Sequence, residues 1–242
     1  MKMTRRAVAP LLLLLLVAAA CKTAARVLDP SFVGPFRSQF NYAHRTPPGT
    51  LHPRRVAVLP VVGREDGGGD LASGAEMLQP ILLEELRQSR AFEVVAFQPA
   101  VGSRIQGAVG LKVTDALPSS LPMEIQTATG AEAALFTEVT GFQAYPPLLL
   151  GLKLTLVSLP QGGILWEFDD VFNAGDPPTL NSARRYLRER LSVETEPVES
   201  ITLDSPRRFA RYALTATLGT LSTSPPPKIV LKLDTKASKD IR

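Results

Sequence analysis

The sequence predicts an α/β (α+β) fold in which a single mixed β-sheet of about five strands carries helices packed on it. Two patterns lead to this class. In the first half of the chain, apolar runs typical of buried strands alternate with an amphipathic helix. In the second half, three strand-like runs follow one another across tight turns and helices come after them, which predicts an antiparallel meander.

The first half of the domain is predicted as strand, helix, strand. RVAVLPV at 55–61 has the character of a central strand, and AFEVVAFQP at 91–99 is the second strand. Residues 73–90 between them show a helical apolar stripe. This stripe consists of Leu78, Leu82 and Leu86. Pro80 fits best in a first turn, so we expect the regular helix to begin near Gln79 after an irregular lead-in.

The second half begins with a short helix from about Leu121 to Thr129, which Gly130 closes. The three strands of the meander are AALFTEVTGFQAY, LLLGLKLTLVSL and ILWEFDDVF, joined by a Pro-Pro turn and by PQGG. The segment TLNSARRYLRERL at 179–191 is predicted to be a helix. A last helix opens with Ser205 as N-cap and Pro206 at its first position.

The first 22 residues have the three-part layout of a secretory signal. A basic start precedes an apolar core at 11–17 and three alanines at 18–20, and the only cysteine of the chain, Cys21, follows directly. The basic residues are Lys2, Arg5 and Arg6. The apolar stretch at 7–20 is too short for a membrane-spanning helix, which needs about 20 residues. A single cysteine also cannot form an internal disulfide.

The stretch VAAAC at 17–21 resembles the bacterial lipoprotein cleavage box. This resemblance implies that Cys21 is acylated with palmitate-type chains and becomes the mature N-terminus, so that the protein is a lipoprotein held on a membrane by its N-terminal lipid. Lys22 implies the outer membrane, with the protein facing the periplasm. The alternative is a plain signal peptide followed by a chance cysteine.

The chain divides into four predicted segments. They are a lipoprotein signal peptide at 1–20, a tether at 21–54, an α/β domain at 55–222 and a basic C-terminal tail at 223–242. After removal of the leader, 24 basic residues stand against 23 acidic residues. Because nucleic-acid binding needs a basic patch or stripe, this near balance argues against a nucleic-acid partner.

Catalytic and metal-binding patterns are weak. Both histidines, His44 and His52, fall in the predicted tether, so we expect no metal site, no cofactor and no histidine-based triad. The densest acidic cluster consists of Glu167, Asp169, Asp170 and Asp176. Strand alternation places Glu167 and Asp169 on one face and Asp170 on the other, so these carboxylates do not converge. We therefore predict that the protein is not an enzyme; an envelope hydrolase that uses these carboxylates is the least favoured alternative.

Arginines on the last two predicted helices are the best candidate binding surface. The set consists of Arg184, Arg185, Arg188, Arg207, Arg208 and Arg211. Such a surface attracts anionic lipid, peptidoglycan or an acidic protein partner. The alternative is a solvated helix face that Glu189 partly neutralises.

Residues 55–172, from RVAVLPV through LLEELRQSRAFEVV and AALFTEVTGF to GILWEF, resemble a group of envelope domains in pattern and element order. The group comprises the curli-secretion lipoprotein, the lipoprotein activator of penicillin-binding proteins and the amino-terminal domain of the Tol translocation protein. The resemblance implies a non-catalytic adaptor or assembly factor of the cell envelope that binds a protein partner.

The second function left open is a subunit of an oligomeric curli-type secretion pore in the outer membrane. The hairpin at 135–159 is the only candidate for insertion into a membrane, because its strands approach the required length. An ordinary sheet hairpin with one face on the core shows the same alternation and is favoured. A homo-oligomer is compatible with either reading.

Overall fold

The computed structural model describes residues 30–45, 53–64, 69–98, 120–159, 162–191 and 205–221. The predicted signal peptide, Cys21 and the predicted C-terminal tail lie outside these ranges.

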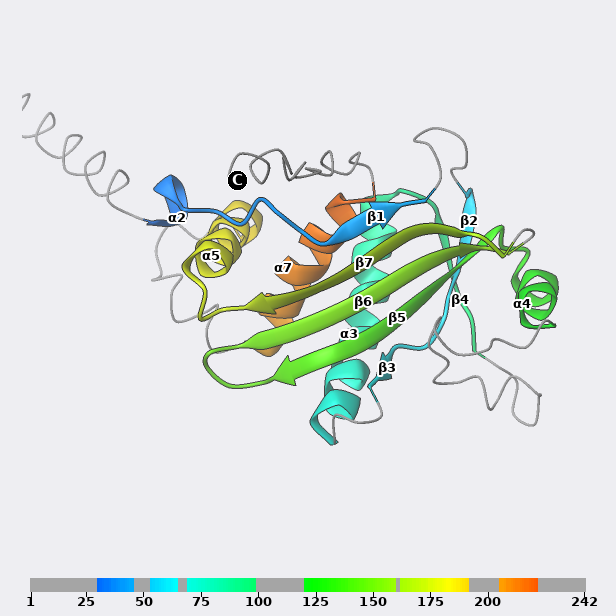
Figure 1. The fold of residues 1–242 in the computed structure, drawn as a ribbon, viewed down its shortest axis with the longest axis horizontal. Helices are drawn as coiled ribbons and strands as arrows, with labels where there is room; N and C mark the ends of the chain where they lie inside the picture. Colours follow the sequence, from blue (N-terminus) through cyan, green and yellow to red (C-terminus); the bar gives the residue numbers. More distant parts are fainter. Residues whose placement is uncertain are drawn as a thin grey trace, which may run out of the picture.

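Within the described ranges, the strands form one seven-stranded mixed sheet with the order β1-β7-β6-β5-β2-β4, and β3 pairs with β5 (Figure 1). The strands are β1 (Tyr42–His44), β2 (Arg55–Val58), β3 (Val62–Gly63), β4 (Glu93–Ala96), β5 (Ala133–Gln143), β6 (Leu149–Ser158) and β7 (Ile164–Asn173). Strand β2 is parallel to both neighbours, β4 and β5, whereas β5, β6, β7 and β1 pair antiparallel in succession. The mixed sheet and the meander are therefore as predicted.

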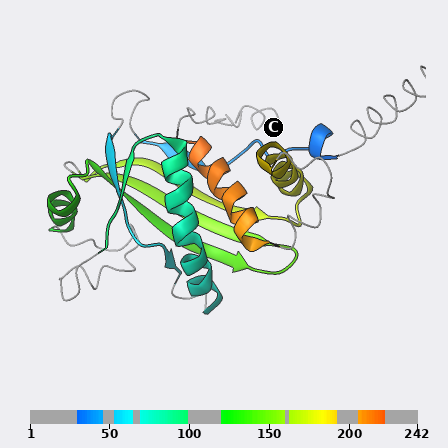
Figure 2. The same cartoon turned by 180° about the vertical axis from the view of Figure 1, so that it is seen from behind.

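The longer helices lie on one face of this sheet. Figure 2 shows α3 (Gly69–Ser89) and α7 (Pro206–Gly219) side by side across it, with α5 (Pro177–Leu191) at one end. The short helix α4 (Leu121–Thr129) lies at the opposite end of the molecule. Its Leu121 and Ile125 pack with Phe136 and Val157 in a second, smaller core. The other short helix, α2 (Pro30–Val33), contacts α5.

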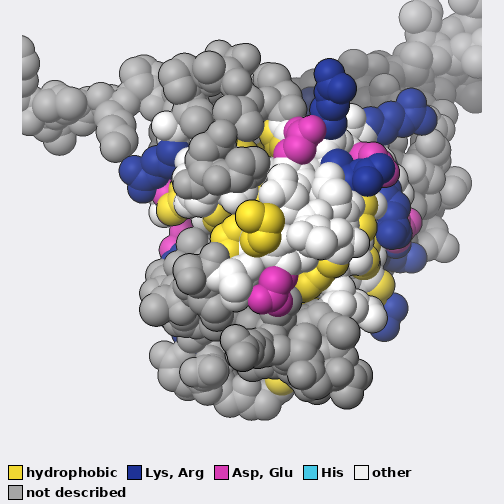
Figure 3. Space-filling view, turned by 90° about the vertical axis from the view of Figure 1, so that its right-hand side faces the viewer, with side chains coloured by type: hydrophobic (Ala, Val, Ile, Leu, Met, Phe, Trp, Pro, Cys, Tyr) yellow, Lys and Arg dark blue, Asp and Glu magenta, His cyan; other side chains and the backbone are white. Residues whose placement is uncertain are grey.

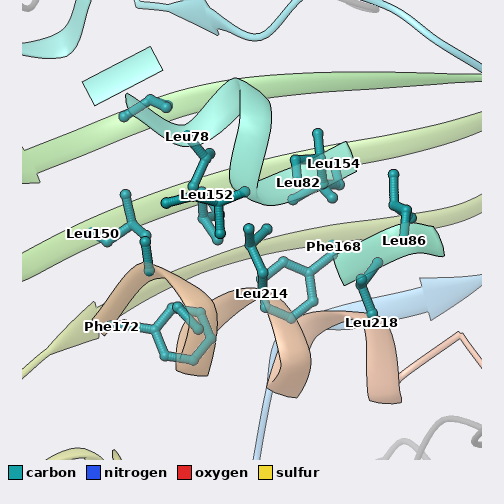
Figure 4. Packing of buried hydrophobic residues seen from close by; sticks show 14 of the residues in the cluster. Leu78, Leu82, Leu86, Leu150, Leu152, Leu154, Phe168, Phe172, Leu214 and Leu218 are labelled. Carbon is teal, nitrogen blue, oxygen red and sulfur yellow. The ribbon is translucent and has the colours of Figure 1, made fainter. Parts of the chain in front are cut away.

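The main core lies between the sheet and the helices α3 and α7. Figure 4 shows leucines of α3 and α7 packed on the leucines of β6 and the aromatic rings of β7. The labelled residues are Leu78, Leu82, Leu86, Leu150, Leu152, Leu154, Phe168, Phe172, Leu214 and Leu218. The apolar side of the hairpin at 135–159 is thus used in this core, as expected for an ordinary sheet hairpin.

Helix α3 begins ten residues earlier than predicted, at Gly69, and Pro80 lies inside it. The prediction of a start near Gln79 is wrong. The apolar stripe continues towards the N-terminus through Leu71 and Ala75, which are both buried. Burial of these side chains offsets the backbone hydrogen bond that Pro80 cannot donate.

The ends of two other helices match their predictions. Helix α4 spans the predicted residues, and Gly130 ends it in the left-handed conformation with φ of 64°. Helix α7 begins at Pro206, and the Ser205 side chain accepts a hydrogen bond from the backbone N–H of Arg208.

Part of the predicted tether at 21–54 packs on the domain. Residues 30–45 run along α5 and then form β1, whose Tyr42 pairs with Phe168 of β7. Together with β3, β1 explains why the sheet has more strands than the predicted five. Strands of two or three residues show no period-2 pattern, so they leave no sequence signal.

Candidate functional site

The N-terminal docked segment, residues 30–45, is held mainly through Arg37. Its guanidinium donates to Asp170 Oδ1 at 2.6 Å, to the Val171 carbonyl oxygen at 2.8 Å and to Thr179 Oγ1 at 3.2 Å. Its backbone N–H donates to Ser182 Oγ at 2.9 Å. The side chains of Arg37 and Asp170 are only 15% and 18% exposed, so this ion pair is shielded from solvent.

Aromatic rings reinforce this attachment. The Arg37 guanidinium carbon lies 4.8 Å from the centre of the Phe172 ring and 5.3 Å from that of Phe40. Phe40 in turn contacts Phe168 and Phe172 of β7. Cation–π contact and ring packing therefore join the docked segment to the main core.

Two of the predicted arginines of α5 contact the beginning of the same segment. Arg185 stacks on Phe36 at 5.0 Å and Arg188 on Phe32 at 4.6 Å, measured from the guanidinium carbon to the ring centre. Phe32 and Val33 are nevertheless 46% and 63% exposed. We call Phe32, Val33, Arg185 and Arg188 the α2–α5 surface, since they combine exposed apolar groups with positive charge.

Arg211, a third arginine of the predicted set, points towards α3 and away from the α2–α5 surface. It pairs with Glu84 and Glu85 of α3, and the hydrogen bond to Glu84 raises the pKa of Arg211. Arg190 of α5 also reaches Glu85, at 3.5 Å, and Thr215 donates to Glu85 at 2.9 Å. The Glu85 side chain is 2% exposed. These five residues, the Glu85 network, fasten α5 and α7 to α3.

The predicted arginine set is therefore divided by the fold. Arg184 lies half-buried on α5, beside the arginines of the α2–α5 surface in sequence. Arg207 and Arg208 lie exposed in the first turn of α7, and in the part of the chain that the structure describes their side chains make no ion pair. Arg211 instead points at α3.

The predicted acidic cluster is also separated. Glu167 pairs with Arg45 at 2.7 Å, whereas Asp170 pairs with Arg37. Asp169 is exposed, and Asp176 lies in the turn that precedes α5, where its carbonyl oxygen accepts from the Leu180 N–H. Among the described residues, no three His, Cys, Asp or Glu side chains are grouped as metal ligands.

The sheet face opposite α3 and α7 carries a polar hollow that the sequence did not indicate. Its volume is about 280 Å³, and Arg45, Lys153, Glu167 and Asp169 are among its lining residues. In the strand register, Lys153 of β6 lies between Glu138 of β5 and Asp169 of β7.

The same sheet face includes Val171, which is 45% exposed. Figure 1 shows β5, β6 and β7 in front of α3 and α7, from this side. We call Arg45, Lys153, Glu167, Asp169 and Val171 the outer sheet face. The sequence signal that could have found this face is the alternation in β6, which places Lys153 opposite the core leucines.

Among the helices in the described ranges, none has the length and apolar character required to cross a bilayer.

Comparison with known proteins shows no family. No family model matches the sequence, and no curated protein matches it. Among solved structures, the PelC dodecamer from Paraburkholderia phytofirmans is similar at 12% identity and a TM-score of 0.38, over 73% of this chain and 98% of that chain.

Two further solved structures show the same level of likeness. Lipoprotein GNA1162 from Neisseria meningitidis is 19% identical with a TM-score of 0.32, over 60% of this chain and 100% of that chain. The LpoB C-terminal domain from Salmonella enterica is 22% identical with a TM-score of 0.31, over 51% of this chain and 86% of that chain. These likenesses concern the fold and assign the chain to no family.

Proposed function

We propose that this protein is a non-catalytic, lipid-anchored lipoprotein of the cell envelope that binds another protein. The lipid is attached at Cys21, and the protein is held in the outer membrane facing the periplasm. The leader at 1–20, with its lipoprotein-type cleavage box, supports this location.

The observation that carries protein binding is the chemistry of the outer sheet face. Charges of both signs alternate across neighbouring strands there, with exposed Val171 beside them. A polyanion such as nucleic acid requires a surface of one sign, whereas a protein partner can oppose each charge with its complement and cover the apolar group. Figure 3 shows the α4 end of the molecule, where apolar, acidic and basic side chains are likewise interspersed.

Val171→Glu is the most direct test of this surface. Crosslinking the native lipoprotein in its membranes and recovering it identifies any bound protein. Because Val171 is 45% exposed, the substitution should leave the thermal unfolding temperature nearly unchanged while the crosslinked partner is lost. The matched control is Met123→Glu, which changes another exposed apolar residue, on α4 and outside both named surfaces. A partner retained in Val171→Glu, or lost equally in both variants, contradicts the assignment of the outer sheet face.

Cys21→Ala tests the anchor independently. We expect the variant to leave the membrane fraction, and we expect intact-mass analysis of the wild-type protein to show an acylated cysteine at the mature N-terminus. An unmodified thiol, or a retained leader, would refute the lipoprotein assignment. Crosslinks formed only between copies of this chain would favour the oligomeric alternative over the adaptor.

A further inference from the structure

We infer that the α2–α5 surface lies against the phospholipid leaflet that holds the lipid anchor, with its arginines at anionic headgroups and Phe32 and Val33 at the interface. This inference rests on the proposed acylation of Cys21. It assigns an orientation to the domain and a ligand class, anionic phospholipid, to one part of its surface.

The first argument is chain length. If all of residues 21–54 were extended, the domain could lie more than about 100 Å from its anchor. The structure docks the chain from Pro30 onward, so only residues 22–29 separate Cys21 from the α2 helix. Nine steps along the chain span at most about 30 Å, whatever their conformation. The α2–α5 surface is therefore the part of the domain that must stay close to the bilayer.

The second argument is the composition of that surface. Phe32 and Val33 are exposed although they belong to the docked segment, and Arg188 stacks on the Phe32 ring. The Arg185 side chain is 56% exposed. Aromatic and apolar groups next to arginine suit the headgroup region, because the rings enter the acyl boundary while the guanidinium groups bind phosphate.

The third argument is charge sign. On the α2–α5 surface, the two arginines Arg185 and Arg188 stand against one acidic side chain of α5, Glu189, which pairs with Arg185. Arg190 pairs with Glu85 on the α3 side and does not add to this charge. The segment from Pro30 to Gln39 has no acidic residue, so nothing in it repels an anionic leaflet. The outer sheet face carries charges of both signs in balance, so it is not attracted to an anionic leaflet. A few arginines bind such a leaflet weakly, but the anchor supplies a high effective concentration, so weak contacts suffice to orient the domain.

A depth measurement tests the orientation on the full acylated protein. An environment-sensitive fluorophore is attached at Val33→Cys or, as the matched control at the far end of the molecule, at Met123→Cys; Met123 is 66% exposed on α4. The protein is placed in vesicles of phosphatidylcholine with phosphatidylglycerol that contain a lipid-attached nitroxide quencher. We expect several-fold stronger quenching at position 33 than at position 123, and weaker quenching at position 33 in vesicles without phosphatidylglycerol.

Two variants separate charge from folding. Arg185→Glu with Arg188→Glu should weaken the quenching at position 33 at least as much as removal of phosphatidylglycerol does, although it also removes the stacks on Phe36 and Phe32. Arg185→Gln leaves the Arg188 stack intact and should reduce the difference partially, with an unchanged unfolding temperature.

The outcomes are distinguishable from failure of the proposed function. If mass analysis shows acylated protein in the vesicles and position 33 is quenched no more than position 123, the orientation is wrong while the anchor stands. If the fluorophore at position 33 reports an apolar environment only in native membranes, and not in protein-free vesicles, then a protein covers this surface. That result overturns the inference. If the cysteine is unmodified, the anchor itself fails.

Discussion

The arginines of α5 and α7 fall into two groups that differ in the burial of their partners. In the Glu85 network, Arg190 and Arg211 meet a carboxylate that is 2% exposed, and they fasten helices together. On the α2–α5 surface, Arg185 pairs with Glu189, whose side chain is 65% exposed. The comparison indicates that an arginine paired with a buried carboxylate stabilises the fold. An arginine paired with an exposed carboxylate contributes little to stability and can exchange that partner for a ligand.

The largest expected effect lies in the first group. Glu85→Ala leaves Arg190 and Arg211 without their shared carboxylate, and it leaves the Thr215 hydroxyl with Tyr186 Oη, at 3.3 Å, as its acceptor. Because both arginines can turn towards water, we expect a loss of about 2–3 kcal/mol in the free energy of unfolding, less than for a fully buried pair. Chemical denaturation measures it. The adjacent Glu84→Ala is the control, since Glu84 is 46% exposed and should cost about 0.5 kcal/mol. Equal losses in the two variants would remove the distinction between the groups.

An intermediate effect is expected at Arg37, which uses a shielded partner to hold the docked segment. Arg37→Ala removes its bonds to Asp170 and Thr179 and should cost about 2 kcal/mol. Hydrogen exchange should accelerate in residues 30–45 more than in β5 and β6. Arg37→Lys keeps the charge but loses the forked geometry, and should recover part of the protection. Unchanged exchange in the segment would show that Phe40 packing alone holds it.

The smallest effect is expected in the second group. Arg185→Ala should change the free energy of unfolding by about 0.5 kcal/mol or less, because its partner Glu189 is exposed and the pair is screened by salt. Thermal melts at low and high ionic strength measure it. A loss approaching that of Glu85→Ala would mean that Arg185 serves the fold and not a binding surface.

Local patterns predicted most of the fold. The meander, α4 with Gly130 and α7 with Ser205 depend on signals within a few residues, and these predictions are confirmed. The predicted start of α3 is wrong because the apolar stripe continues through buried Leu71, ahead of Pro80. Burial against the sheet outweighs a single missing hydrogen bond.

The candidate binding surfaces were harder to predict because they depend on distant contacts. The contact of Arg37 with Asp170 joins residues 133 positions apart, and no local pattern indicates it. The sequence does carry a local signal for the direction in which Arg211 points. Leu214 and Leu218 follow it at helical spacings of three and seven, and both are buried, so Arg211 shares the side of α7 that faces α3.

In the proposed lipoprotein, strand β1 would connect the lipid anchor mechanically to the sheet. Any tension between the bilayer and a bound partner would enter the domain at Pro30 and reach the Arg37 contacts before the β1–β7 hydrogen bonds. If only the Arg37 contacts broke, the connection between Cys21 and the domain would grow from residues 22–29 to include the docked residues up to β1. The domain would then travel tens of ångströms further from the membrane without unfolding its core.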